Sequence, residues 1–112
     1  MSNNMDLLQK KCTPCEGGTQ PFGTPEINGF MARLSEPWQT DSQKIWKEFT
    51  FPDFRASMKF VNAIADIAEA EGHHPDIYIF YNKVKVELST YAIGGLSEHD
   101  FIMAAKILKV LA

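Results

Sequence analysis

The chain has 112 residues, of which 45% are apolar, and its formal net charge is −3. This length suits one domain with a single core, and the composition is that of an ordinary globular protein. The negative charge and the lack of a basic cluster argue against a nucleic-acid partner. No apolar run approaches the roughly 20 residues that span a bilayer, and the polar start does not resemble a signal peptide. We therefore expect a cytoplasmic protein without membrane contact.

The first 23 residues are polar and hold both cysteines of the chain, Cys12 and Cys15. Two cysteines at this spacing are compatible with half of a zinc site or with a redox pair. A structural zinc site needs four ligands, and no second Cys or His pair has suitable spacing. A redox pair normally opens a helix, whereas Pro14 and two glycines surround this one. We expect residues 1–23 to form a loosely packed polar arm and residues 24–112 to form the domain.

The domain begins with the pattern of a short helix and two strands. Thr24 as N-cap and Pro25 at the first position are typical of a helix start, and apolar residues then recur at helical spacing over 27–34. Two strands are expected over 38–40 and 44–51. In the second strand apolar and polar residues alternate, which indicates an antiparallel strand with one buried face.

A long amphipathic helix is expected next, from a cap at Asp53 to Ala70. Aspartate is a favoured N-cap because its side-chain oxygen accepts a hydrogen bond from a backbone N–H of the first turn. Apolar residues at helical spacing define the face that we expect to be buried. They are Phe54, Met58, Val61, Ile64, Ala65 and Ala68.

A hairpin is expected over 77–81 and 84–89, with a two-residue turn at 82–83 that places Ile79 opposite Val86. The predicted order is therefore helix, strand, strand, helix, strand, strand, helix. This order indicates an α+β fold. Its simplest arrangement is a four-stranded antiparallel sheet with three helices packed on one face.

The last helix, over 101–112, is apolar almost all round. Ser97 and Asp100 precede it with the spacing of a capping box. A helix of this kind must be buried on more than one side, and in so small a domain we expect another subunit to supply part of the burial. The positions expected to face that subunit are Ile102, Met103 and Val110.

Two of the three histidines lie between the long helix and the second hairpin. Glu69 lies four residues before His73, so the two are expected on one face at the helix end. Pro75 prevents His74 from continuing the helix. The pair either serves chemistry, or one imidazole interacts with the helix dipole while the other points to solvent. A metal site is not expected, because His73 and His74 point apart in an extended chain and only nearby carboxylates remain as ligands.

Three motifs follow one another along the second half of the chain. They are Glu-x-x-x-His-His-Pro-Asp, Tyr-Asn-x-Val-x-Val-x-Leu-Ser-Thr and Gly-Leu-Ser-Glu-x-Asp. Together they resemble the pterin-4a-carbinolamine dehydratase family, and the resemblance extends from Trp38 to the last helix. It implies an enzyme that removes water from 4a-hydroxytetrahydropterin and so recycles the cofactor of aromatic amino-acid hydroxylases. The pterin is then the substrate, and no metal or cofactor is implied.

The resemblance also implies roles for individual residues. His73 and His74 match the family's active-site pair, and histidine, which titrates near neutral pH, can give or take the protons of a dehydration. Glu69 matches a carboxylate that orients one imidazole. The positions that match residues lining or supporting the pocket are Trp38, Ser89, Thr90 and Asp100. Each of these four also has a structural interpretation, as a core residue, a strand end or a helix cap.

One position departs from the family pattern. Members normally carry a third histidine directly after Ser-Thr, where this chain has Tyr91. Tyrosine donates a hydrogen bond, but its pKa near 10 makes it a poor base at neutral pH. The resemblance therefore implies a site of His73, His74 and Tyr91 with reduced activity. The third histidine of the chain, His99, does not match the missing position.

The family also suggests partners. Some members form tetramers and use the same helical surface to stabilise dimers of a homeodomain transcription factor. The resemblance thus implies a homo-oligomer, either dimer or tetramer. It leaves an alternative to catalysis, in which a weakly active or inactive member acts as a protein-binding dimerisation cofactor.

Overall fold

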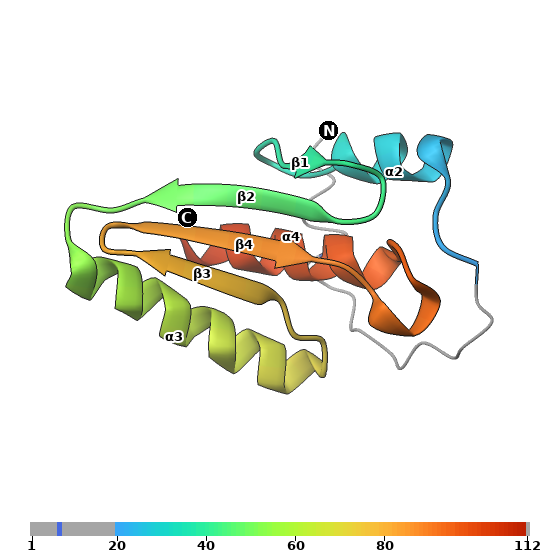
Figure 1. Cartoon of the computed structure of the whole chain (residues 1–112). Helices are drawn as coiled ribbons and strands as arrows, with labels where there is room; N and C mark the ends of the chain where they lie inside the picture. Colours follow the sequence, from blue (N-terminus) through green and yellow to red (C-terminus); the bar gives the residue numbers. More distant parts are fainter. Residues whose placement is uncertain (1–6, 8–19, 112) are drawn as a thin grey trace.

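The computed structural model describes Leu7 and residues 20–111 (Figure 1). The elements in chain order are α2 (Thr24–Met31), β1 (Gln39–Thr40), β2 (Ile45–Thr50), α3 (Phe54–Glu71), β3 (Asp76–Phe80), β4 (Lys83–Leu88), the 3-10 turn η1 (Tyr91–Ile93) and α4 (Glu98–Val110). The strands pair antiparallel in the order β1-β2-β4-β3. This confirms the predicted α+β fold.

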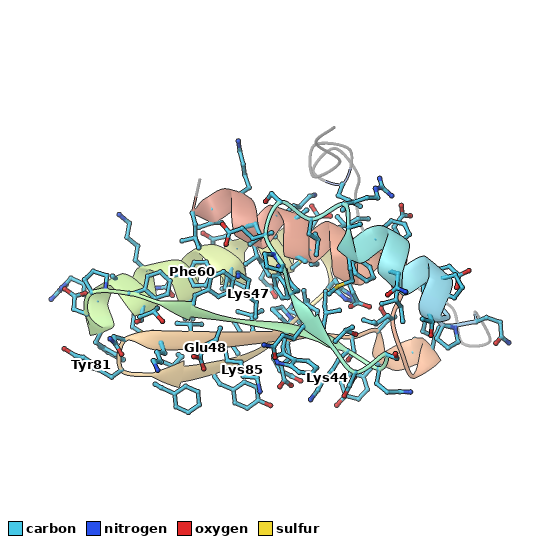
Figure 2. All side chains as sticks on the ribbon, turned by 90° about the horizontal axis from the view of Figure 1, so that it is seen from above. Lys44, Lys47, Glu48, Phe60, Tyr81 and Lys85 are labelled. Atoms are coloured by element: carbon cyan, nitrogen blue, oxygen red, sulfur yellow. The ribbon has the colours of Figure 1, made fainter. Side chains whose placement is uncertain are left out.

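The two faces of the sheet differ in what covers them. Figure 2 looks down on the molecule, with Phe60 and the helices on one side of the sheet and Lys44, Glu48 and Lys85 on the other. The covered face holds the apolar core, in which Val84 and Val86 of the central strand β4 are fully buried. Within the described part of the chain, no helix combines the length and the apolar character needed to cross a membrane.

Helix α3 has the predicted ends but a different buried face. Asp53 caps it by accepting a hydrogen bond from the N–H of Ala56 at 2.8 Å. Phe54, expected inside, is largely exposed, whereas Phe60 is buried. The ring of Phe60 lies 4.8 Å from that of Phe49, so the aromatic side chains of β2 set the rotation of the helix. The predicted stripe was therefore correct at Ile64 and Ala68, wrong at the exposed Phe54 and Ala65, and incomplete without Phe60.

The second hairpin turns one residue earlier than predicted. Tyr81 and Asn82 form the turn, and Ile79 faces Val84, two residues from its expected partner. The backbone N–H of Phe51, at the end of β2, donates to the carbonyl of Asn82 at 2.7 Å. This contact from another strand supports the earlier turn. A register change of two residues keeps every side chain on its predicted face of the sheet.

Helix α4 is covered within one chain, and the expectation that Ile102 and Met103 face another subunit is wrong. Both side chains are buried by the chain itself. The second side of the helix packs against α2 and the segment before it, where Phe22 and Phe30 stack with Phe101 at centroid distances of 6.3 and 5.3 Å. The apolar character of α4 thus reflects coverage by α2 as well as by the sheet and α3.

Most of the predicted arm, including Cys12 and Cys15, lies outside the described residues. Leu7 belongs to the buried core. The N–H of Phe22 donates to the carbonyl of Leu96 at 2.8 Å, which ties the segment before α2 to the segment before α4. The boundary between an arm and the domain stays a prediction.

Replacement of Phe101 should test this packing. We expect Phe101→Ala to lower the free energy of unfolding by about 3–5 kcal/mol, because the ring is fully buried in the aromatic stack. Phe54→Ala is the matched control, since that ring is 49% exposed and should change stability by less than about 1 kcal/mol. Urea unfolding at a fixed protein concentration measures both. Equal losses would contradict the packing described for α4.

Candidate active site

The histidine pair follows a helix end that turns the chain sharply. Gly72 ends α3 in the left-handed conformation, with φ of 66°, and its N–H donates to the carbonyl of Ala68 at 2.9 Å. Glycine adopts this conformation without the strain that a Cβ would cause. His73, His74 and Pro75 then lead into β3. The turn directs the two imidazoles to different partners.

His73 points toward the start of α4. Its Nε2 lies 2.7 Å from Oδ1 of Asp100, whose carboxylate is fully buried. The other oxygen, Oδ2, accepts hydrogen bonds from the hydroxyl of Thr90 at 2.9 Å and from the backbone N–H of Ser97 at 3.0 Å. The structure therefore brings together three of the residues predicted for the site. Asp100 both completes the capping box of α4 and holds His73.

The donors and acceptors of this network can be assigned in order. Thr90 gives its one hydroxyl proton to Asp100, so the 2.8 Å contact between Thr90 and Ser97 requires Ser97 to donate. Ser97 in turn accepts from the N–H of His99 at 3.2 Å. An ionised Asp100 only accepts, so the Nε2 of His73 must carry a proton. The second ring nitrogen, Nδ1, is then the one available for chemistry.

His74 points to the end of α3 instead. Its Nε2 lies 2.7 Å from Oε2 of Glu69, and both side chains are mostly exposed. Glu69 was expected to share a face with His73, four residues away. The left-handed Gly72 changes this, because the helical spacing no longer applies beyond it. Glu69 can orient an imidazole as predicted, but the imidazole is that of His74.

Three predicted site residues are not brought to the histidines. Trp38 precedes β1, and β1 is separated from β3 by three strand spacings of about 4.8 Å each. The ring of Trp38 packs edge-on against Phe49. Its buried indole N–H has no acceptor among the described residues. Ser89 is half-buried beside Thr90. Tyr91 is 92% exposed in η1, and its phenol has no hydrogen bond or ring contact in the described part of the chain.

The face of the sheet near Trp38 carries a separate groove. Its volume is about 500 Å³, and none of the histidines lines it. The lining residues are Pro37, Trp38, Gln39, Trp46, Lys47, Glu48 and Lys85. Trp38 thus packs in the core and lines this groove, in agreement with its interpretation as a core residue.

Sequence reasoning missed His99. Its ring lies 6.1 Å from that of His73, centroid to centroid, at an interplanar angle of 70°. Burial lowers the pKa of His99, the neighbouring charge of His73 lowers it further, and Asp100 and Glu98 oppose the shift. The one signal in the sequence was that His99 precedes Asp100. That signal has meaning only when Asp100 is known to reach His73, which is 27 residues away.

The arrangement suits proton transfer. It combines an imidazole whose tautomer is held by a buried carboxylate, a second imidazole beside it and a third on the exposed rim. Within Leu7 and residues 20–111, no group of three or more His, Cys, Asp or Glu side chains is placed to hold a metal ion.

Comparison with known proteins identifies a family for this chain. The pattern of the family described as pterin 4 alpha carbinolamine dehydratase matches residues 20–110. A Nitrosospira multiformis relative bearing that enzyme's name is 51% identical over 102 residues, which cover 91% of this chain and 89% of the relative. One from Nitrosomonas eutropha is 45% identical over 107 residues, which cover 96% and 95%.

Solved structures share the fold. The crystal structure of a transcriptional coactivator/pterin dehydratase from Brucella melitensis matches with a TM-score of 0.76 and 32% identity, covering 83% of this chain and all of that one. A pterin dehydratase-like protein identified as a RuBisCO assembly factor matches with a TM-score of 0.53 and 24% identity, over 62% of this chain and 81% of that one. The second likeness concerns the fold alone.

The role of Asp100 can be tested without an activity assay. We expect Asp100→Ala to lower the free energy of unfolding by about 3–5 kcal/mol, because it leaves buried donors without their charged acceptor. Nitrogen NMR of the neutral form of His73, recorded at high pH, should show the proton on Nε2 in the natural protein and lose that preference in the variant. Glu98→Ala, in the same helical turn, is the control, with a loss of about 0.3–1 kcal/mol. An unchanged tautomer in Asp100→Ala would contradict the network.

Proposed function

Since the chain belongs to the pterin-4a-carbinolamine dehydratase family, we propose that it removes water from 4a-hydroxytetrahydropterin to give the quinonoid dihydropterin. The observation that carries this proposal is the 2.7 Å contact between His73 and the buried carboxylate of Asp100. It gives one imidazole a defined tautomer at an accessible end of the sheet. The reaction recycles the cofactor of aromatic amino-acid hydroxylases and needs no metal or further cofactor.

The dehydration has two proton transfers. As the bond between C4a and the hydroxyl oxygen breaks, the hydroxyl leaves with the electron pair and takes a proton to become water. The proton on N5 leaves to a base, and its electron pair forms the C4a=N5 double bond. Asp100 holds the Nε2 side of the His73 ring, so the protonated ring can deliver a proton from Nδ1 to the departing hydroxyl. In this proposal His74, which pairs with Glu69 on the exposed rim, contacts the pterin and exchanges protons with solvent.

Tyr91 has a smaller part in this proposal. A phenol can donate a hydrogen bond to the pterin, but as a residue type it is a poorer proton acceptor than an imidazole. Because Tyr91 stands where the family pattern has histidine, activity should be lower than with an imidazole there. The 92% exposure of Tyr91 leaves the side chain accessible to a bound ligand.

We also propose that the chain forms a homo-oligomer, but through a surface other than the one expected from α4. Strand β3 is an edge strand, so within the described part of the chain one side of its backbone has no partner strand. At its end Ile79, Phe80 and Tyr81 are 40%, 55% and 67% exposed. A second copy that pairs with this edge would satisfy the backbone and cover the apolar side chains.

The same surface supports a second candidate function. A partner protein with an apolar edge or helix could bind β3, in which case the chain would act as a protein-binding dimerisation cofactor with weak or no catalysis. The exposed apolar end of β3 favours this candidate. Dehydratase activity above the spontaneous rate distinguishes the two, because the binding function does not require it.

The histidines should be essential for the rate. We expect His73→Ala and His74→Ala each to lower kcat with a 4a-hydroxytetrahydropterin by about 10²–10⁴-fold, the usual contribution of a general acid or base. Rates are followed by absorbance in a stopped-flow instrument and corrected for the spontaneous reaction. Circular dichroism should show an intact fold, because neither side chain belongs to the apolar core.

Two outcomes would contradict this assignment. A double alanine variant with natural activity would remove both histidines from the mechanism. Loss of activity after prolonged chelation, with recovery on adding a divalent metal, would show that a metal ion takes part.

Charge placed on the edge strand should dissociate the oligomer. We expect the natural protein to sediment as a dimer or tetramer at micromolar concentration, and the Ile79→Lys/Phe80→Lys double variant to sediment as a monomer. Burying two lysines against a partner costs several kcal/mol. Val110→Lys, at the exposed end of α4, is the control and should leave the assembly unchanged. The opposite pattern would locate the interface on α4, and a monomeric natural protein would contradict the proposal.

A further inference from the structure

We propose that His99 is a third catalytic imidazole of this site, and that it takes the proton from N5 of the pterin while His73 protonates the departing hydroxyl. The inference rests on the proposed dehydratase function and assigns a residue that the sequence motifs leave out. It is carried by the position of the His99 ring, edge-on to the ring of His73 at a centroid distance of 6.1 Å.

The reaction needs a separate acid and base close to one another. His73 has one nitrogen committed to Asp100, so a single nitrogen remains for the substrate. His74 turns toward Glu69 on the rim and shares no such contact with His73. Among the described residues, His99 is the imidazole whose ring packs against that of His73. Two ring systems at this distance can face adjacent atoms of one ligand, such as N5 and the oxygen on C4a.

Helix α4 and a hydrogen bond position the backbone of His99 beside His73. His99 lies in the first turn of α4, between Glu98 and Asp100, and its N–H donates to Ser97. Ser97, Thr90 and Asp100 continue the hydrogen bonds to the ring of His73. The backbone of one histidine and the side chain of the other therefore belong to a single network. The end of α3 and the start of α4 lie at the same end of the sheet (Figure 1).

The surroundings also divide the two roles. Asp100 contacts His73 directly through its side chain and leaves Nδ1 of that ring as the nitrogen that can hand a proton to the substrate. Burial and the charge of His73 lower the pKa of His99, against the opposing effects of Asp100 and Glu98, so His99 is neutral at pH 7 and able to accept a proton. Paired groups whose environments favour opposite protonation states are typical of acid–base catalysis. After each turnover the proton on His99 returns to His73, directly or through solvent.

The test is a His99→Ala variant assayed with 4a-hydroxytetrahydropterin from pH 5 to pH 9. Alanine is the best helix former, so the first turn of α4 should survive, and circular dichroism and thermal unfolding verify this. We expect kcat to fall by at least about 10²-fold with little change in KM. The fall in kcat of the natural protein toward low pH, as His99 is protonated, should disappear. Millimolar imidazole should restore part of the rate, which it would not do for a purely structural residue.

Comparison variants separate the outcomes. If His99→Ala keeps kcat within twofold and has the natural pH profile, the catalytic role of His99 is wrong. The dehydratase function still stands in that case if His73→Ala is impaired. Large loss in Tyr91→Phe together with an active His99→Ala would assign the third group to the phenol instead. A natural protein no faster than the spontaneous reaction would overturn the dehydratase function itself, and the role of His99 with it.

Discussion

The contact between His73 and Asp100 joins the two parts of the chain on which the site depends. One partner follows the C-terminus of α3, and the other lies in the first turn of α4. Three donors surround a carboxylate from which water is excluded, and a buried ion of this kind persists only when its hydrogen bonds are satisfied. The same carboxylate caps α4, so the interaction that starts the last helix also orients the imidazole. Local helix stability and the geometry of the site are thereby coupled.

Much of the fold could be predicted because it depends on local patterns. The caps at Asp53 and Ser97 and the strand alternation in β2 each involve residues a few positions apart, and each appears in the structure. Predictions failed where a contact between residues distant in the sequence determines the structure. The rotation of α3 follows from Phe49, the turn of the second hairpin from Phe51, and the burial of α4 from Phe22 and the residues of α2.

The candidate site shows the same division. The motif predicted His73, His74 and Asp100, but the spacing argument paired Glu69 with the wrong histidine, since helical periodicity ends at Gly72. Trp38 lies in the stretch that resembles the family, but three strand spacings separate the strand it precedes from β3. His99 could not be predicted, because its significance depends on two side chains brought together over a separation of 27 residues. A tertiary contact turned an unremarkable helix position into a neighbour of the site.

Comparison of three carboxylates with buried side chains shows why Asp100 suits the proposed chemistry. Glu71 pairs with Lys106 at 2.6 Å. Glu87 pairs with Lys85 at 3.1 Å and with Lys44 at 3.2 Å. Burial raises the pKa of Glu87, but the two lysines together outweigh this effect, so the net pKa is lowered and the carboxylate stays ionised. Lysine keeps its charge far above neutral pH, so both of these ion pairs are permanent and structural.

Asp100 differs from both because its ionic partner is histidine, whose charge changes near neutral pH. The hydrogen bonds from Thr90 and Ser97 keep this carboxylate satisfied whether or not His73 carries a full charge. The proton on the free nitrogen of His73 can therefore leave without stranding a buried ion. A lysine in place of His73 would stabilise Asp100 more strongly, but it would not give up its proton at pH 7. The imidazole thus allows a buried ion pair to take part in proton transfer.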